Sequence, residues 1–131
     1  MADEIGAWPS EVIPDSDALY MRAHKCFFQN QSLQPGVFRD HGGTMSTDWS
    51  KYSSPEKTQF RSRIPDDNSV IAFEAGCARD IGLNVTHTPD HDLKNRAHTD
   101  VVGTKTPKVR VILLRNCNVV LHGKSISTQT P

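Results

Sequence analysis

The chain has 131 residues, and its 15 Lys and Arg residues balance 15 Asp and Glu residues, so its formal net charge is zero. This length is typical of a single domain. The absence of a basic surplus argues against a nucleic-acid partner, because affinity for phosphates depends mainly on excess Lys and Arg. No stretch approaches the roughly 20 apolar residues of a membrane span, so we expect no membrane partner.

The composition divides the chain into an arm, a domain and a tail. Residues 1–17 are acidic, contain prolines and lack the basic and apolar regions of a secretory signal. We therefore expect an irregular arm on a cytoplasmic protein. Residues 18–122 mix short strand-like and helix-like segments, which predicts one α+β domain. Residues 123–131 are polar and predict a flexible tail.

Two expected strands carry polar side chains on one face. Residues 18–24 partly alternate between apolar and polar, which places Tyr20, Arg22 and His24 on one face and the apolar residues on the other. Residues 44–49 predict a second strand with a similar alternation. Strands of this kind pack one face on the core and leave the polar face for solvent or a ligand.

The rest of the domain predicts a mixed or antiparallel sheet with three short helices. A Ser-Ser-Pro-Glu sequence begins a helix that should end near Arg63, and Gly82 should end a second helix. Thr106 and Pro107 favour a third helix, although the run VRVILL would also suit a strand. The other expected strands cover residues 37–38, 69–73, 83–86, 97–102 and 118–121. The expected core contains Leu19, Met21, Val70, Ile71, Phe73, Ile81, Leu83, Val101, Leu113 and Val120.

The first candidate site combines polar side chains from three expected strands. It contains Arg22 and His24, then Ser46 and Thr47, and finally His98. Arginine can bind phosphate with two parallel hydrogen bonds, hydroxyls can bond a ribose or a phosphate, and histidine exchanges protons near neutral pH. These residues predict a polar pocket for a nucleotide or NAD-like anion, with Arg22 as the anionic anchor. Ordinary hydrogen bonds between edge strands would account for the same pattern.

A second candidate site is the histidine-rich loop. It contains His87 and His91 and is followed by His98, and imidazole is a ligand that zinc, iron and nickel accept. A His-ligated metal is therefore an alternative function. The spacing of the first two histidines would place both on one face only in a helix, and Pro89 disfavours a helix there. The three cysteines form no CxxC pair, so a zinc ribbon is not expected.

Apolar side chains support a third interpretation, a non-catalytic accessory subunit of a bacterial complex. Trp8 lies in the arm, and a tryptophan in such a segment is typical of docking on the fold or on a partner. Phe27, Phe28 and Trp49 would extend that partner surface.

Four segments of the chain resemble a set of small bacterial proteins. These segments are LYMRAH, the stretch around MSTD, AGCARDIGL and NRAHTDVVG, and they span about residues 18–121. The set implies no activity that can be transferred to this chain.

The chain also has a more distant similarity to ADP-ribosyltransferases of the Arg-Ser-Glu type. In that family an arginine on the first strand is followed by a Ser-Thr-Ser strand and a late glutamate. Arg22 corresponds to the arginine, and Ser46 with Thr47 corresponds to part of the second motif. No ExE or QxE pair occurs in the C-terminal half, so His98 or Asp100 would have to replace the glutamate. The resemblance implies NAD or another nucleotide as the ligand.

Overall fold

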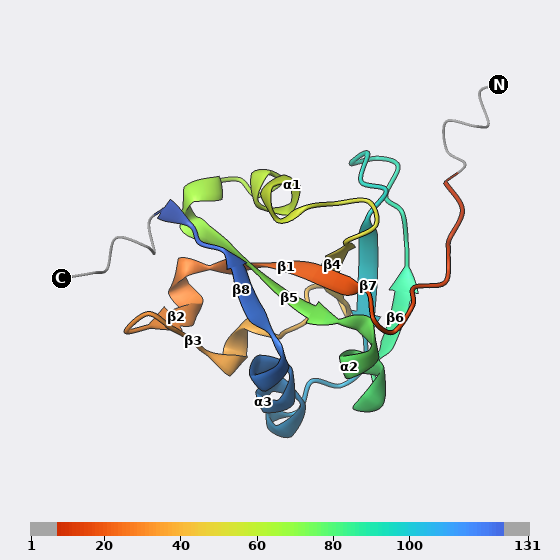
Figure 1. The fold of residues 1–131 in the computed structure, drawn as a ribbon. Helices are drawn as coiled ribbons and strands as arrows, with labels where there is room; N and C mark the ends of the chain where they lie inside the picture. Colours follow the sequence, from red (N-terminus) through yellow and green to blue (C-terminus); the bar gives the residue numbers. More distant parts are fainter. Residues whose placement is uncertain (1–7, 125–131) are drawn as a thin grey trace.

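An antiparallel sheet of six strands forms the centre of the computed structural model, which describes residues 8–124 (Figure 1). Its strands are β1 (Ala18–His24), β4 (Met45–Trp49), β5 (Asn68–Glu74), β6 (Asn84–His87), β7 (His98–Val102) and β8 (Asn118–Leu121). They lie in the order β6-β7-β4-β1-β5-β8. A separate hairpin pairs β2 (Phe28–Gln29) with β3 (Ser32–Leu33). Together with the helices α1 (Pro55–Phe60), α2 (Ala75–Asp80) and α3 (Pro107–Asn116), these strands confirm the predicted α+β fold class.

The core lies against one face of the sheet, because strand side chains alternate between the two faces. In β1, Leu19 and Met21 are buried whereas Arg22 is exposed. Helices α2 and α3 cover the apolar face and lie on the same side of the sheet in Figure 1. The ring of Phe38 packs edge-on against the ring of Phe73, with 6.1 Å between the ring centres. The predicted alternation of β1 is therefore the pattern that builds this core.

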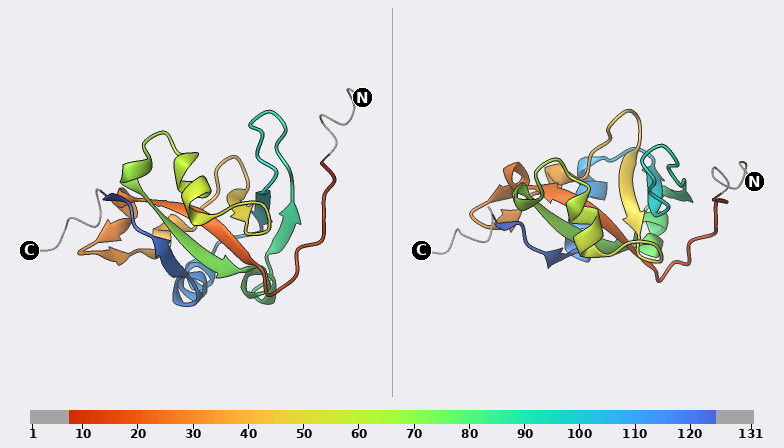
Figure 2. Two further views of the ribbon diagram at one scale, coloured as in Figure 1. Left: turned by 45° about the horizontal axis from the view of Figure 1, so that its top comes forward. Right: turned by 90° about the horizontal axis from the view of Figure 1, so that it is seen from above.

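Helix α1 and the loop between β6 and β7 lie on the opposite, more polar face of the sheet (Figure 2). Helix α1 begins after Ser54, whose hydroxyl accepts a hydrogen bond from the N–H of Lys57, and Pro55 suits the first turn. Thr58 faces the sheet and is buried. The polar face is only partly covered, since Arg22 of β1 remains exposed.

Strands β1 and β4 pair at one end only. All seven residues of β1 pair with β5, but only Leu19 and Tyr20 pair with β4, opposite Trp49 and Asp48. Beyond these pairs the two strands separate, and residues of both strands line a common cavity. The sheet therefore has an opening between two of its central strands.

Two of the predicted elements differ from the structure. Residues 37–38 do not form a strand, because Val37 belongs to the 3₁₀ turn Pro35–Val37 and the N–H of Phe38 donates to the carbonyl of Pro35. Helix α1 ends before Arg63, because Ser62 donates to the carbonyl of Gln59 through both its N–H and its hydroxyl. Both corrections come from local hydrogen bonding that apolar periodicity does not reveal.

In the C-terminal part of the domain the favoured third helix is present, and one predicted core residue is exposed. The run VRVILL belongs to helix α3, where the hydroxyl of Thr106 accepts a hydrogen bond from the N–H of Val109. Val120, predicted to lie in the core, is 42% exposed. Its neighbour Val119 pairs with the buried Ile71, so Val120 points to the other face of the edge strand β8.

The N-terminal arm is held against the domain. Residues 8–17 contain no helix or strand, and the side chain of Ile13 is buried in the core. The Ser10 hydroxyl donates to the His87 carbonyl at 2.6 Å. Residues 1–7 of the predicted arm lie outside the described residues.

The C-terminal end of the domain extends to Gly123. This residue is buried, and its N–H donates to the hydroxyl of Ser69 at 3.0 Å, so it belongs to the packed domain rather than to the predicted tail. Residues 125–131 lie outside the described residues. No helix within residues 8–124 is long and apolar enough to cross a membrane.

Candidate functional site

A cavity of about 760 Å³ opens on the polar face of the sheet, where β1 and β4 separate. Strands β1, β4 and β7 line it from the sheet, and α1 and the loop between β6 and β7 contribute further lining residues. The segment before β4 adds Arg39 and His41. Small-molecule sites usually occupy roughly 300–1,000 Å³, so this cavity has the size of a ligand pocket.

Three arginines from separate segments line the cavity: Arg22 of β1, Arg39, and Arg61 directly after α1. Nη1 of Arg22 donates to the carbonyl of Thr58 at 3.2 Å. The guanidinium of Arg39 lies over the ring of Phe27, with 5.1 Å from its central carbon to the ring centre. None of the three forms an ion pair with another described residue. The cavity therefore holds cationic groups whose charge the described residues do not neutralise.

Asp48 is the only carboxylate among the described residues that line the cavity. It is buried, and its oxygens accept hydrogen bonds from the hydroxyl of Thr58 at 2.9 Å and from the amide of Asn95 at 2.8 Å. Bonds to an ionised acceptor are stronger than bonds between neutral groups. Asp48 thereby fixes α1 and the loop between β6 and β7 to the sheet.

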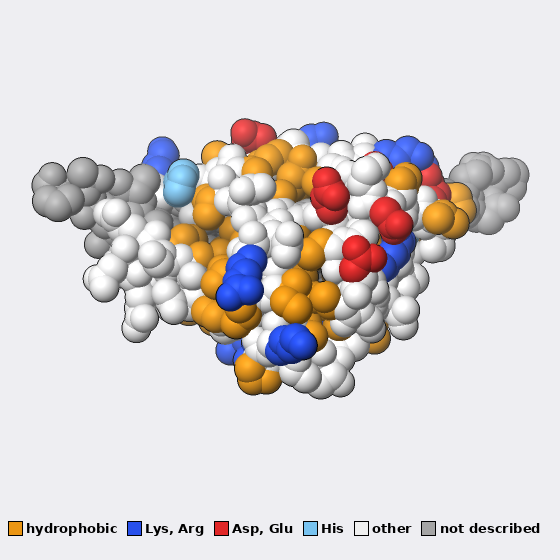
Figure 3. Space-filling model, turned by 60° about the horizontal axis from the view of Figure 1, so that its bottom comes forward, with side chains coloured by type: hydrophobic (Ala, Val, Ile, Leu, Met, Phe, Trp, Pro, Cys, Tyr) orange, Lys and Arg blue, Asp and Glu red, His pale blue; other side chains and the backbone are white. Residues whose placement is uncertain are grey.

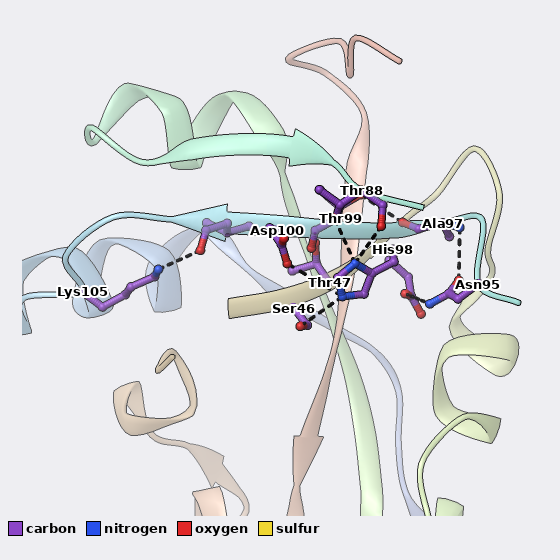
Figure 4. Close-up of polar contacts among 11 residues, drawn as sticks. Ser46, Thr47, Thr88, Asn95, Ala97, His98, Thr99, Asp100 and Lys105 are labelled. Atoms are coloured by element: carbon purple, nitrogen blue, oxygen red, sulfur yellow. Dashed lines mark hydrogen bonds and ion pairs between the residues drawn. The ribbon is translucent and has the colours of Figure 1, made fainter. Parts of the chain in front are cut away.

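His98 is held in one orientation beside Ser46 (Figure 4). Its Nδ1 lies 3.0 Å from the carbonyl oxygen of Thr88 and 2.9 Å from the hydroxyl of the same residue. A carbonyl can only accept, so a proton on Nδ1 is donated to Thr88 and leaves Nε2 as the acceptor of the ring. Nε2 lies 3.2 Å from Oγ of Ser46. Asp100 Oδ1 lies 3.8 Å from the same nitrogen.

The structure brings the five residues of the predicted polar pocket to this one cavity. All five make hydrogen bonds within the protein, and those of Arg22, Ser46 and His98 are described above. Nδ1 of His24 accepts from the N–H of Cys26 at 3.0 Å, and the hydroxyl of Thr47 donates to the carbonyl of Thr99 at 3.1 Å. The five residues are Arg22, His24, Ser46, Thr47 and His98.

Several lining residues were not predicted from the sequence. Asp48 shares a strand face with Ser46, so the alternation of β4 was a signal that could have included it. Arg39 lies in a loop and Arg61 at a helix end, where no periodicity indicates the direction of a side chain. Phe60, the last residue of α1, also lines the cavity and is 79% exposed.

The histidine-rich loop does not gather its imidazoles around one point. His87 is buried on the core face, where Nδ1 accepts from the N–H of Glu11 and Nε2 donates to the carbonyl of Arg96. His91 stacks on Trp8 with 4.9 Å between ring centres. The remaining histidine of the motif faces the cavity. Within residues 8–124, no group of three or more His, Cys, Asp or Glu side chains is arranged to hold a metal.

The aromatic residues proposed for a partner surface make contacts within the protein. Trp8 is half-buried against His91, and Trp49 is buried. Phe27 and Phe28 are partly buried and pack against the core. On the underside of the molecule, hydrophobic side chains are interrupted by Lys and Arg (Figure 3). These observations identify no particular partner.

The three cysteines differ in their burial and in their distance from the cavity. Cys26, Cys77 and Cys117 are free, and of these Cys26 is exposed and lines the cavity. Burial raises the pKa of Cys77, with smaller contributions from nearby carboxylates, and burial also raises the pKa of Cys117. These two thiols are therefore poor nucleophiles at neutral pH.

Comparison of the chain with protein-family models, curated proteins and solved structures finds no match.

Proposed function

We propose that the cavity between β1 and β4 binds a nucleotide, such as NAD, with Arg22 as the anchor for its phosphate groups. The observation that carries this proposal is the charge of the lining. Arg22, Arg39 and Arg61 line the cavity, whereas its only carboxylate among the described residues, Asp48, is already hydrogen bonded. Guanidinium groups match the geometry of phosphate and bind it with pairs of hydrogen bonds.

The cavity also offers apolar surface for the base of a nucleotide. Phe60 and Leu93 line it and are 79% and 70% exposed. A single exposed apolar residue is common on protein surfaces. Here the aromatic ring of Phe60 and the aliphatic side chain of Leu93 both lie at an arginine-rich cavity, where they can contact the flat base of a nucleotide. Bases stack on aromatic side chains with about 1–3 kcal/mol each. This pairing of guanidinium and aromatic groups favours a nucleotide over a simple inorganic anion.

Hydroxyl and imidazole groups would contact the sugar and the remaining phosphate oxygens. Ser46 is exposed on β4, and His41 lies at the end of the segment that leads to this strand. Serine hydroxyls both donate and accept hydrogen bonds, as recognition of a ribose requires. The polar groups therefore come from several elements around one cavity, which is the arrangement typical of ligand sites.

A thermal-shift experiment tests this proposal. We expect NAD and ADP to raise the melting temperature by several degrees at concentrations far above Kd, because a ligand that binds only the folded state stabilises it by mass action. Adenosine lacks phosphate and should give a much smaller shift. Replacement of a cavity arginine, Arg61→Gln, should reduce the NAD shift.

The matched control is Arg63→Gln, because Arg63 is exposed two residues further along and does not line the cavity. This variant should keep the full shift. Equal shifts for adenosine and ADP would contradict the role of the arginines, and the absence of any nucleotide shift would contradict the proposal itself.

A further inference from the structure

Ser46 and His98 have the geometry of a nucleophile and its base. Their side chains meet on the cavity face of neighbouring strands, with 3.2 Å between Oγ and Nε2 (Figure 4). Activated serines are recognised by such a contact, of roughly 2.6–3.2 Å, to a base that a third group orients. Here the third group is Thr88, whose carbonyl and hydroxyl both lie beside Nδ1.

The surroundings of His98 suit the uptake of a proton. With Nδ1–H held by the Thr88 carbonyl, Nε2 has the lone pair that can accept the hydroxyl proton of Ser46. The imidazolium that forms would lie beside Asp100, whose Oδ1 is 3.8 Å from Nε2. A carboxylate near a protonated histidine stabilises that charge, and here it lies on the Nε2 side of the ring rather than on the Nδ1 side as in the serine–histidine–aspartate triad.

Ser46 also differs from the other hydroxyl on its strand. Thr47 is buried and donates to the carbonyl of Thr99, so its oxygen is committed to the fold. Ser46 is exposed to the cavity, and its hydroxyl contacts His98. The oxygen placed for attack therefore faces the space where the arginines would hold a phosphate.

We infer that Ser46 and His98 hydrolyse a phosphoanhydride bond of a nucleotide held in this cavity, an inference that rests on the proposed nucleotide binding. Oγ of Ser46 attacks phosphorus while its proton passes to Nε2 of His98. The bond from phosphorus to the bridging oxygen breaks, and the second phosphate group leaves with the electron pair. The product of this step is a nucleotidyl or phosphoryl ester of Ser46.

Water completes the cycle and no other reactant is consumed. Once His98 has released the first proton to solvent, it accepts a proton from a water molecule that attacks the same phosphorus. The bond to Oγ breaks, and Ser46 recovers its proton from His98. A phosphate leaving group has a second pKa of about 6, so it departs without a general acid on the opposite side. Arg22, Arg39 and Arg61 would balance the charge on the phosphate oxygens.

The test uses the 4-nitrophenyl ester of thymidine 5′-monophosphate, whose nitrophenolate also leaves without a proton. Release of nitrophenolate is measured for the wild type, Ser46→Ala, His98→Gln and the control Ser32→Ala, because Ser32 is exposed on the β3 hairpin outside the cavity. We expect turnover by the wild type and the control, loss to background in Ser46→Ala and a loss of about 100-fold or more in His98→Gln. Mass spectrometry of the quenched wild type should find a nucleotidyl ester on Ser46.

A parallel thermal-shift titration with NAD separates the two proposals. Ser46→Ala keeps the arginines and should still be stabilised by NAD. Stabilisation of the wild type without ester turnover, or equal turnover by the wild type and Ser46→Ala, would overturn the hydrolase inference and leave nucleotide binding intact. No stabilisation and no turnover in the wild type would overturn both.

Discussion

Ser46 and Thr47 are adjacent in sequence, yet the environments of their hydroxyls differ because strand side chains alternate between faces. The Thr47 hydroxyl is buried and bonds the backbone of β7, whereas that of Ser46 faces the cavity beside His98. From the sequence, both residues were predicted to lie in one site, since both hydroxyls suit a ligand. The direction of the side chain decides the role of each residue: Thr47 bonds the neighbouring strand, and Ser46 is available to a substrate.

At the same scale, Glu11 joins the arm to the domain through charged hydrogen bonds. Nζ of Lys51 donates to one carboxylate oxygen at 2.6 Å, and the hydroxyl of Tyr52 donates to the other. These bonds from Lys51 and Tyr52 hold the pKa of Glu11 below its ordinary value. The ionised carboxylate therefore stabilises the fold above the pKa of the unfolded chain, and this stabilisation is lost as pH falls through the lowered pKa.

We predict that Glu11→Gln lowers the melting temperature at pH 7 and that the difference from the wild type shrinks between about pH 5 and pH 2. Thermal unfolding followed by circular dichroism across this range checks the prediction. Glu74→Gln is the control, because Glu74 is exposed and, unlike the half-buried Glu11, forms no ion pair with another described residue. A difference between Glu11→Gln and the wild type that stays constant down to pH 2 would mean that the carboxylate charge is not what holds the arm.

At the scale of elements, alternation in the sequence was enough to predict the strands that carry the site. β1 is apolar on one face and polar on the other, and its predicted bounds agree with the structure. The same pattern correctly placed Arg22 and His24 together. Alternation could not predict which strands are neighbours, so the opening between β1 and β4 became visible only in the fold.

The parts of the site outside the strands could not be predicted for a different reason. Arg39 follows a 3₁₀ turn and Arg61 caps the end of α1, so their directions depend on local turns and on tertiary contacts. One such contact is the bond from Thr58 to Asp48, which joins residues from different elements. Interactions of this kind have no periodic signature in the sequence.

Phe73 in β5 tests the assignment of the core. It is 2% exposed and packs against Phe38, so we expect Phe73→Ala to lower the free energy of unfolding by about 3–5 kcal/mol. Urea unfolding followed by tryptophan fluorescence measures this change. Val120→Ala is the matched control, because Val120 was also predicted to be in the core but is exposed, and its replacement should cost less than about 1 kcal/mol. A similar cost for both variants would contradict the packing of β5.

At the scale of the whole molecule, charge is balanced overall but unevenly distributed. The net charge of zero led us to expect no nucleic-acid partner, and that expectation concerns binding by a surplus of basic residues. Several carboxylates that do not line the cavity are paired with cations, as in the contacts of Asp15 with Arg79 and of Asp40 with Lys105. The arginines around the cavity have no such partner among the described residues. A neutral protein can therefore present one locally cationic pocket for a small anion.

The central claim is that this pocket binds a nucleotide through Arg22, and calorimetric titration of NAD into the wild type and Arg22→Ala tests it most directly. A hydrogen bond to a charged group contributes about 1.5–3 kcal/mol, so we predict that Kd rises about 10- to 150-fold in the variant. Arg22 is exposed, so the fold should be nearly unchanged, and Arg115→Ala on α3 should bind NAD like the wild type. Equal affinity of the wild type and Arg22→Ala, or no binding of NAD by the wild type, would contradict the account.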